Sequence, residues 1–174
     1  MESKTFAEGG TEPFIIGKGE FYRDRRGSFT PLRALAGTLQ CNVSVSVPHT
    51  VRGMHCQRVH PQEKLLSCLS GRIHDVCVDV RPGSPTFGKA FEFELAGGTG
   101  SQLFVPVGFA HGFEVVGAEP AMVLYMVSAP YDPADERGFH WTGVPVAWST
   151  KREDAILSEK DEVLPPFALF AKGL

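Results

Sequence analysis

Strict alternation of apolar and polar residues is the feature that most constrains the fold of this chain. In segment 41–47 every odd position is Cys or Val and every even position is Asn or Ser. Successive side chains of a β-strand point to opposite faces of its sheet, so this period of two predicts a strand. The same reasoning predicts strands at residues 64–69, 73–80, 91–95, 102–105, 113–116 and 121–127. Strands that recur this often, with Gly- and Pro-rich turns between them, predict an all-β antiparallel barrel or jelly roll.

Helical periodicity is scarce. Only segments 133–137 and 152–161 are expected to form short helical turns. No repeat, linker or low-complexity run divides the 174 residues, so we expect one domain over residues 1–174.

Charge and cysteine patterns exclude several classes of function. The chain has 17 Lys and Arg against 20 Asp and Glu, whereas nucleic acids and anionic membranes bind clustered positive surfaces. Polar residues interrupt the longest uncharged stretches, and the N-terminus is polar, so we expect a cytoplasmic protein without a membrane span. The 4 Cys show no CxxC spacing, which disfavours a disulfide framework or a zinc site. An anionic small molecule remains compatible, because two or three well-placed Arg or Lys would bind it.

His55 follows Gly53 in the segment 52–57, where a glycine permits a sharp bend or a close backbone approach. Taken alone, a single histidine at a strand end is more often a hydrogen-bonded structural residue than a catalytic one.

Lys64 shifts that balance, because it begins an apolar strand where an unpaired ammonium is costly. If Ser70-Gly71 forms a tight hairpin turn, Lys64 lies opposite Cys77, with Asp75 and Asp79 as diagonal neighbours. This register predicts an ion pair between Lys64 and one of the two carboxylates. Such a pair would either belong to a functional site or serve only to stabilise the fold, and both interpretations stay open.

Residues 106–113 contain the spacing Pro-x-Gly-x-x-His, which ends at His111. This spacing resembles the second half of the cupin signature, a double-stranded β-helix motif. The first half requires His-x-His followed by Glu, and the chain has only His55-Cys56-Gln57 there. Zinc or iron typically takes three protein ligands. The motif therefore supports a cupin-like barrel more than it supports a metal site.

Tyr125 shares a strand face with Val123 and Val127, as expected for a core tyrosine whose hydroxyl is hydrogen-bonded. The functional alternative is a proton donor that projects into the barrel.

Seven motifs together resemble the dTDP-4-dehydrorhamnose 3,5-epimerase family, in the same order and from about Phe14 to Pro166. They are Asp24-Arg25-Arg26-Gly27-Ser28-Phe29, Gln40-Cys41-Asn42, Arg52-Gly53-Met54-His55, Lys64, Ser84-Pro85-Thr86-Phe87-Gly88, 106–113 and Ile156-Leu157-Ser158-Glu159-Lys160-Asp161. The resemblance implies a cupin-type double-stranded β-helix jelly roll and a homodimer. It also implies a nucleotide-diphosphate sugar substrate, with no metal and no other cofactor.

The resemblance also implies catalytic roles for four residues. His55 matches the general base that removes a proton next to a ketone, and Asp161 matches the carboxylate that orients it. Lys64 matches the cation beside the developing oxyanion, where preorganised charge is most valuable. Tyr125 matches the acid that returns a proton from the opposite face.

Eight further positions match substrate-binding residues of the family: Arg26, Phe29, Gln40, Asn42, Arg52, His111, Tyr131 and Lys160. Arg26 and Arg52 match diphosphate contacts, Arg26 reaching across the dimer. Gln40 and Asn42 match positions near the base, and His111 and Tyr131 match positions near the sugar. Lys160 is expected near the phosphate.

Two departures affect the base and entry side of the pocket. Pro31 stands where the family commonly has Glu, and His49 stands where many members have Gly. These differences leave the nucleotide and the exact sugar open.

Three alternatives stay open. The first is a single-centre 3- or 5-epimerase from an antibiotic or capsular-polysaccharide pathway. The second is a metal-dependent cupin enzyme with His55 and His111 as ligands, which a metal assay would identify. The third is a sugar-binding module without turnover, which would not need a matched base and acid.

Overall fold

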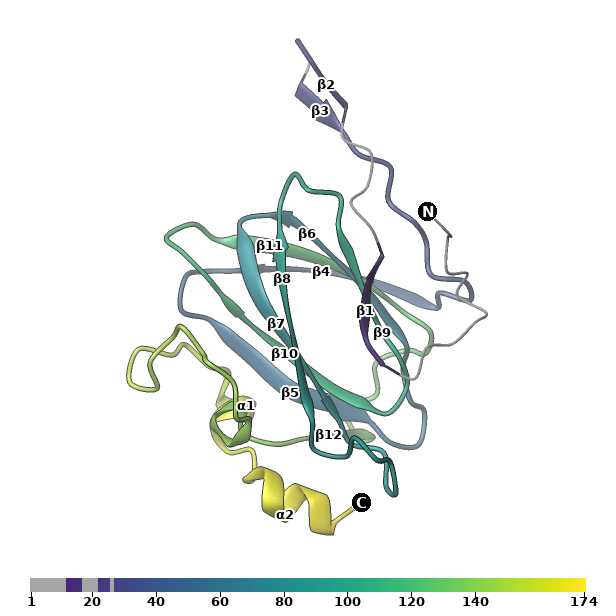
Figure 1. Ribbon diagram of the computed structural model, residues 1–174, viewed down its shortest axis with the longest axis vertical. Helices are drawn as coiled ribbons and strands as arrows, with labels where there is room; N and C mark the ends of the chain where they lie inside the picture. Colours follow the sequence, from purple (N-terminus) through teal and green to yellow (C-terminus); the bar gives the residue numbers. More distant parts are fainter. Residues whose placement is uncertain (1–11, 17–21, 26) are drawn as a thin grey trace.

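The computed structural model describes residues 12–16, 22–25 and 27–174, and most strands of this part of the chain form two five-stranded antiparallel sheets (Figure 1). The β6 sheet has the order β1-β9-β6-β11-β4, and the β10 sheet has the order β12-β5-β10-β7-β8. The small hairpin β2–β3 extends away from both sheets (Figure 1). The strands are β1 (Phe14–Ile16), β2 (Tyr22–Asp24), β3 (Gly27–Phe29), β4 (Gln40–Ser46), β5 (Val51–Gln57), β6 (Lys64–Ser70), β7 (Arg72–Asp79), β8 (Ala90–Ala96), β9 (Gln102–Val105), β10 (Phe109–Val115), β11 (Ala121–Val127) and β12 (Glu136–Gly138).

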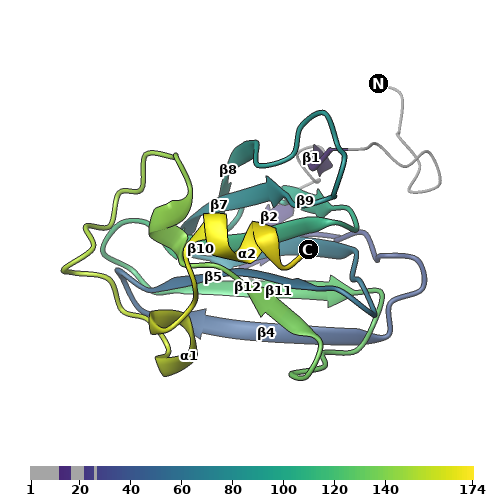
Figure 2. The same cartoon turned by 90° about the horizontal axis from the view of Figure 1, so that it is seen from below.

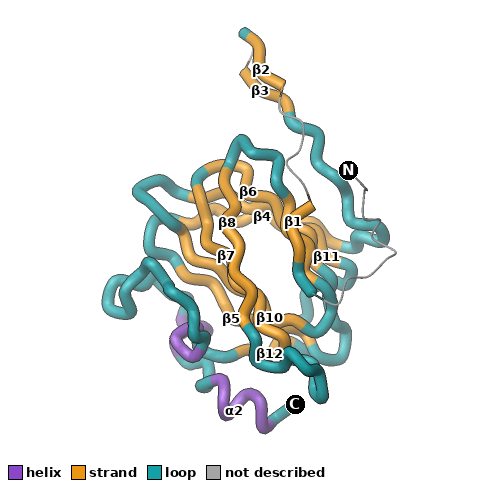
Figure 3. The backbone as a smooth tube through the Cα atoms, viewed as in Figure 1, coloured by secondary structure: helices purple, strands orange, loops and turns teal. Residues whose placement is uncertain are grey.

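Between β4 and β12 the chain changes sheet at every connection except β7–β8. This winding is that of a jelly roll, in which sequence neighbours belong to opposite layers. The described helices are short and lie near the C-terminus (Figure 3): η1 (Trp141–Gly143), α1 (Glu159–Glu162) and α2 (Phe167–Lys172). The prediction of an all-β jelly roll is confirmed.

The hairpin predicted at Ser70-Gly71 is wrong. The turn joins β6 of one sheet to β7 of the other, and the Cα partners of Lys64 are Val105 on β9 and Val127 on β11. Lys64 is therefore not paired with Cys77 in a ladder, and no described carboxylate forms an ion pair with it. Alternation identifies a strand but not its partner, and here distant strands already flank β6 on both sides.

The two segments predicted to be helical are mostly turns, a strand and irregular chain. In segment 133–137 a turn leads into β12, because Glu136 pairs with Gln57 at the edge of the β10 sheet. In segment 152–161 only the last residues belong to α1. The structure adds α2, whose Phe170 packs on Phe139 at a centroid distance of 5.0 Å.

The core has two main parts. One fills the space between the sheets and includes Leu66, Leu103 and Phe113. The other covers the outer face of the β10 sheet, where Phe139 and Phe170 pack against Met54. Figure 2 shows α2 crossing this region. Among the described residues, no helix is long and apolar enough to cross a membrane.

Strand β4 turns its apolar side chains outward, whereas strands of a two-layered fold usually turn them toward the core. Its alternating valines are exposed, with Val43 60% and Val45 59% accessible. The polar positions Gln40, Asn42 and Ser44 are partly buried on the other face. Because this polar face points inward, it supplies hydrogen-bonding groups to the interior of the jelly roll.

Candidate active site

A cavity of about 490 Å³ lies inside the jelly roll and brings together ten of the twelve predicted site residues. Its lining comprises Gln40, Asn42, Arg52, His55, Cys56, Gln57, Gln62, Lys64, Leu66, His111, Phe113, Tyr125, Val127, Tyr131, Glu136, Ser158, Lys160 and Asp161. Phe29 is not among them, because it lies on the projecting hairpin and is 67% exposed. Arg26 lies outside the described residues.

His55 and Asp161 form a close pair at one wall of the cavity. Nε2 of His55 lies 2.6 Å from Oδ1 of Asp161, and the carboxylate is almost fully buried. Burial alone would raise the pKa of Asp161, but the hydrogen bond and charge of His55 outweigh it and lower that pKa. The carboxylate therefore stays ionised and fixes the tautomer in which His55 carries a proton on Nε2.

The chain between 150 and 161 explains how Asp161 reaches a histidine 106 residues earlier. Ile156 joins the start of β5 through Val51 N to Ile156 O at 3.0 Å and Ile156 N to His49 O at 2.9 Å. Two residues later, Ser158 caps α1 by accepting a hydrogen bond from Asp161 N. These contacts hold the first turn of α1 beside His55.

The backbone near His55 depends on two unusual positions. At Gly53, φ is 115°, and a Cβ there would lie 2.7 Å from Gly112 Cα, so only glycine fits between β5 and β10. At His49, φ is 66°, in the left-handed region that favours glycine. A residue other than glycine adopts this conformation only at an energetic cost.

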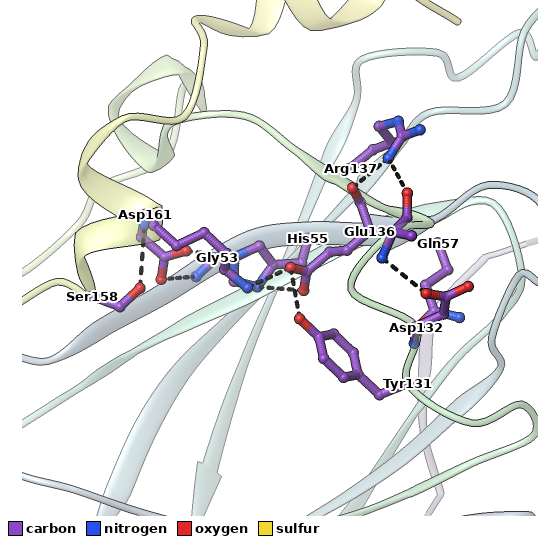
Figure 4. Close-up of polar contacts among 11 residues, drawn as sticks. Gly53, His55, Gln57, Tyr131, Asp132, Glu136, Arg137, Ser158 and Asp161 are labelled. Atoms are coloured by element: carbon purple, nitrogen blue, oxygen red, sulfur yellow. Dashed lines mark hydrogen bonds and ion pairs between the residues drawn. The ribbon is translucent and has the colours of Figure 1, made fainter.

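Glu136 is a site residue that sequence reasoning missed. Its carboxylate lies 3.9 Å from Nδ1 of His55 and accepts hydrogen bonds from Tyr131 Oη at 3.2 Å and from Lys160 Nζ. Figure 4 shows His55 between Asp161 and Glu136. No sequence signal marked Glu136, because its position depends on the pairing of β12 with β5.

Lys64 contributes a cation to the interior of the cavity. Burial lowers its pKa, and the negative charges of Glu136 and Asp75 oppose that effect. An ammonium with no ion-pairing carboxylate among the described residues is available to an anion in the cavity.

Tyr125 and the polar face of β4 form another wall. Tyr125 is the Cα partner of Asn42, and the described residues offer its hydroxyl no hydrogen-bond partner. Gln40 Nε2 donates to Asn42 Oδ1 at 2.7 Å, and Gln40 Oε1 accepts from Tyr131 N at 2.9 Å. Because Asn42 meets Gln40 through its Oδ1, and no described residue accepts from its NH₂ group, that group is left for a ligand.

Arg52 and Lys160 place positive charge at the cavity. Arg52 Nε donates to Ser46 Oγ at 2.9 Å, which orients the guanidinium. Lys160 is held by Glu136. Two cations at one cavity suit a phosphate group.

His111 is the second histidine of the cavity. It is the Cα partner of His55 across β10 and β5, and its Nε2 lies 2.8 Å from Oδ2 of the fully buried Asp75. The cavity therefore contains two histidine–carboxylate pairs on neighbouring strands.

The donor set does not resemble a metal centre. No group of three or more His, Cys, Asp or Glu among the described residues is arranged to hold a metal ion. Burial raises the pKa of the Cys56 thiol to about 11, so this cysteine is protonated and not a nucleophile at neutral pH.

Comparisons with known proteins identify the family. Residues 15–168 match the family model for dTDP-4-dehydrorhamnose 3,5-epimerase. The enzyme of that name from Sinorhizobium fredii is 44% identical over 133 residues, which cover 74% of this chain and 67% of that protein. The enzyme from Methanothermobacter thermautotrophicus is 35% identical over 164 residues, which cover 87% and 88%. The chain belongs to the dTDP-4-dehydrorhamnose 3,5-epimerase family.

A solved structure of this family has the same fold. The dTDP-6-deoxy-D-glucose-3,5-epimerase of Legionella pneumophila, in complex with dTDP-4-keto-L-rhamnose, is 33% identical. The two chains superpose with a TM-score of 0.83, over 90% of this chain and 88% of that one. The resemblance predicted from the motifs is confirmed, and with it the expectation of an isomerase.

Proposed function

We propose that this chain epimerises C3 and C5 of a nucleotide-linked 4-keto-6-deoxy sugar, converting dTDP-4-dehydro-6-deoxyglucose to dTDP-4-dehydrorhamnose. The observation that carries the proposal is the grouping of a carboxylate-held histidine, a buried ammonium and an unpartnered phenol around one cavity. Proton transfer next to a ketone needs these three groups: a base, an oxyanion stabiliser and an acid.

His55 acts first, as the general base. Nε2 donates to Asp161, so Nδ1 takes the proton from the carbon next to the ketone. The electrons of the broken C–H bond form the enolate, and the ammonium of Lys64 stabilises the negative charge that develops on the enolate oxygen. Asp161 stabilises the imidazolium that results.

Tyr125 acts second, as the acid on the other face. Its hydroxyl gives a proton to the enolate carbon, the ketone re-forms, and the configuration inverts. Solvent then reprotonates the phenolate and takes the proton from His55. The same groups serve C3 and C5 in turn.

The remaining wall binds the nucleotide. Asn42 offers its NH₂ group to a carbonyl oxygen of the base, and Gln40 holds Asn42 in place. Arg52 and Lys160 bind the diphosphate. Tyr131 and His111 contact the sugar. The role of Arg26 stays a prediction.

The active form in this proposal is a homodimer of single-domain chains. The exposed valines of β4 form an apolar stripe of the kind that subunit interfaces cover. Phe29 does not line the cavity of its own chain, so we assign it to the cavity of a second copy.

Sedimentation equilibrium tests the dimer, with an expected mass of twice 18.9 kDa. Val45→Lys should give a monomer, because it places a charge in the apolar stripe. Val163→Lys is the control, since Val163 is 80% exposed elsewhere on the molecule and its variant should stay dimeric. A monomeric, fully active wild-type chain would contradict this part.

Proton NMR in deuterated water tests the reaction. With dTDP-4-dehydro-6-deoxyglucose as substrate, deuterium should enter at both C3 and C5. Exchange at one carbon only would make the chain a single-centre epimerase. No exchange at either carbon would overturn the proposal.

A further inference from the structure

Of the four buried carboxylates outside the His55 pair among the described residues, three have structural roles, and Asp75 is the fourth. Asp79 accepts from Arg81, Ser84 and Thr86, and so closes the loop after β7. Asp135 and Glu114 bind backbone amides of neighbouring loops. Each of these three carboxylates fixes a loop to the fold by accepting several hydrogen bonds.

Asp75 differs from the other three. Its side chain is fully buried inside β7, yet no described backbone amide, arginine or hydroxyl donates to it. Its one short contact is the 2.8 Å hydrogen bond from His111 Nε2, and the Cys77 thiol lies 3.8 Å from its other oxygen. Burying a carboxylate for one histidine is costly, and no loop is fixed by it.

The histidine it holds lines the cavity. His111 uses Nε2 for Asp75, and no described residue hydrogen-bonds to its Nδ1. A neutral imidazole has one N–H donor and one lone-pair acceptor. With the carboxylate taking the donor, Nδ1 is left as an acceptor.

We propose that Asp75 is a positioning residue that acts through His111, holding it as a hydrogen-bond acceptor for a hydroxyl group of the sugar. This inference rests on the proposed function. The ketone oxygen of the substrate needs donors, which Lys64 provides, whereas the hydroxyls beside it need an acceptor. The carboxylate of Asp75 fixes the tautomer and the ring orientation that make His111 this acceptor.

A double-mutant cycle tests whether Asp75 acts through His111. Asp75→Asn removes the charge without changing the volume, and should lower kcat/KM by about ten- to a hundredfold, as expected for a charge-assisted hydrogen bond. His111→Gln should cost at least as much, and the double variant no more than His111→Gln alone. Costs that simply multiply would overturn the proposal.

A matched control separates this role from fold stability. Asp79→Asn, on the same strand and the same face, should leave kcat/KM within twofold while lowering the thermal midpoint. The affinity for dTDP, which lacks the 4-keto-6-deoxy hexose, should be unchanged in Asp75→Asn. Weaker dTDP binding in proportion to the lost kcat/KM would show a general distortion and overturn the positioning role.

Nitrogen-15 NMR of the wild-type enzyme tests the tautomer of His111 directly. This measurement does not depend on whether an Asp75 variant folds. The signals of His111 are assigned by their loss in His111→Gln. At neutral pH the free enzyme should show a protonated Nε2 and an unprotonated Nδ1. A protonated Nδ1 would contradict the proposal, and this result is independent of whether the wild type exchanges substrate protons.

Discussion

The two histidine–carboxylate pairs of the cavity are built alike but have different surroundings. His55 and His111 face each other as Cα partners, and each directs Nε2 to a buried carboxylate, at 2.6 and 2.8 Å. Nδ1 of His55 lies near Glu136, while the described residues leave Nδ1 of His111 without a partner. A histidine–carboxylate pair alone therefore does not identify a general base. What the imidazole does depends also on the groups that surround its Nδ1.

Replacing each histidine in turn gives the largest expected contrast. His55→Ala should abolish deuterium wash-in at C3 and C5, because no other described base is paired with Asp161. His111→Ala should keep wash-in, slowed by about ten- to a hundredfold through the lost hydrogen bond. Wash-in followed by NMR measures both, and equal losses would remove the distinction between the pairs.

Removing the cation should be nearly as severe as removing the base. Lys64→Met keeps much of the side-chain volume but leaves the enolate oxygen without its counter-charge, so wash-in should fall below detection. Retained exchange in a folded Lys64→Met variant, judged by circular dichroism, would assign the oxyanion to another group.

Asp161→Asn should slow wash-in without abolishing it, because Asp161 orients the base and does not touch the substrate. It should also destabilise the fold by about 1.5–3 kcal/mol at pH 7, the range for a lost hydrogen bond to a charged group. The depressed pKa of Asp161 means that its stabilisation is present above the unfolded value of about 4 and is lost as pH falls through the folded value. Denaturant melts at pH 7 and at a pH below the folded pKa of Asp161 should therefore differ between variant and wild type only at the higher pH.

Exhaustive chelation should have the smallest effect, with wash-in unchanged after EDTA treatment. The prediction follows from the donor set, because the two histidines are each committed to a carboxylate and no group of three or more His, Cys, Asp or Glu among the described residues is arranged to hold a metal ion. Activity lost with EDTA and restored by one metal would place the chain among the metal-dependent cupins.

The sequence predicted the strands better than their arrangement. Alternation placed β4 correctly but did not reveal that its valines face outward and its polar residues face the cavity. The turn at Ser70-Gly71 looked like a hairpin, yet it crosses between sheets. Local pattern records which residues share a face, whereas strand partners depend on contacts between distant segments.

The active site was likewise predicted in part: the motifs identified its main residues but not all of their partners. The order of the motifs predicted that His55, Lys64 and Asp161 belong to one site, and all three line the cavity. Glu136 had no motif, and the predicted partner of Asp75 was Lys64 rather than His111. Both depend on strand register, which period-two alternation does not encode.

The most direct test of the central claim is the behaviour of Tyr125→Phe in deuterated water. The account requires abstraction on one face and delivery from the other, so this variant should still take up deuterium through His55 but with retained configuration. Inverted product should fall by about 10²- to 10⁴-fold, the usual contribution of a positioned acid. A folded Tyr125→Phe enzyme that inverts its substrate at the wild-type rate would contradict the account.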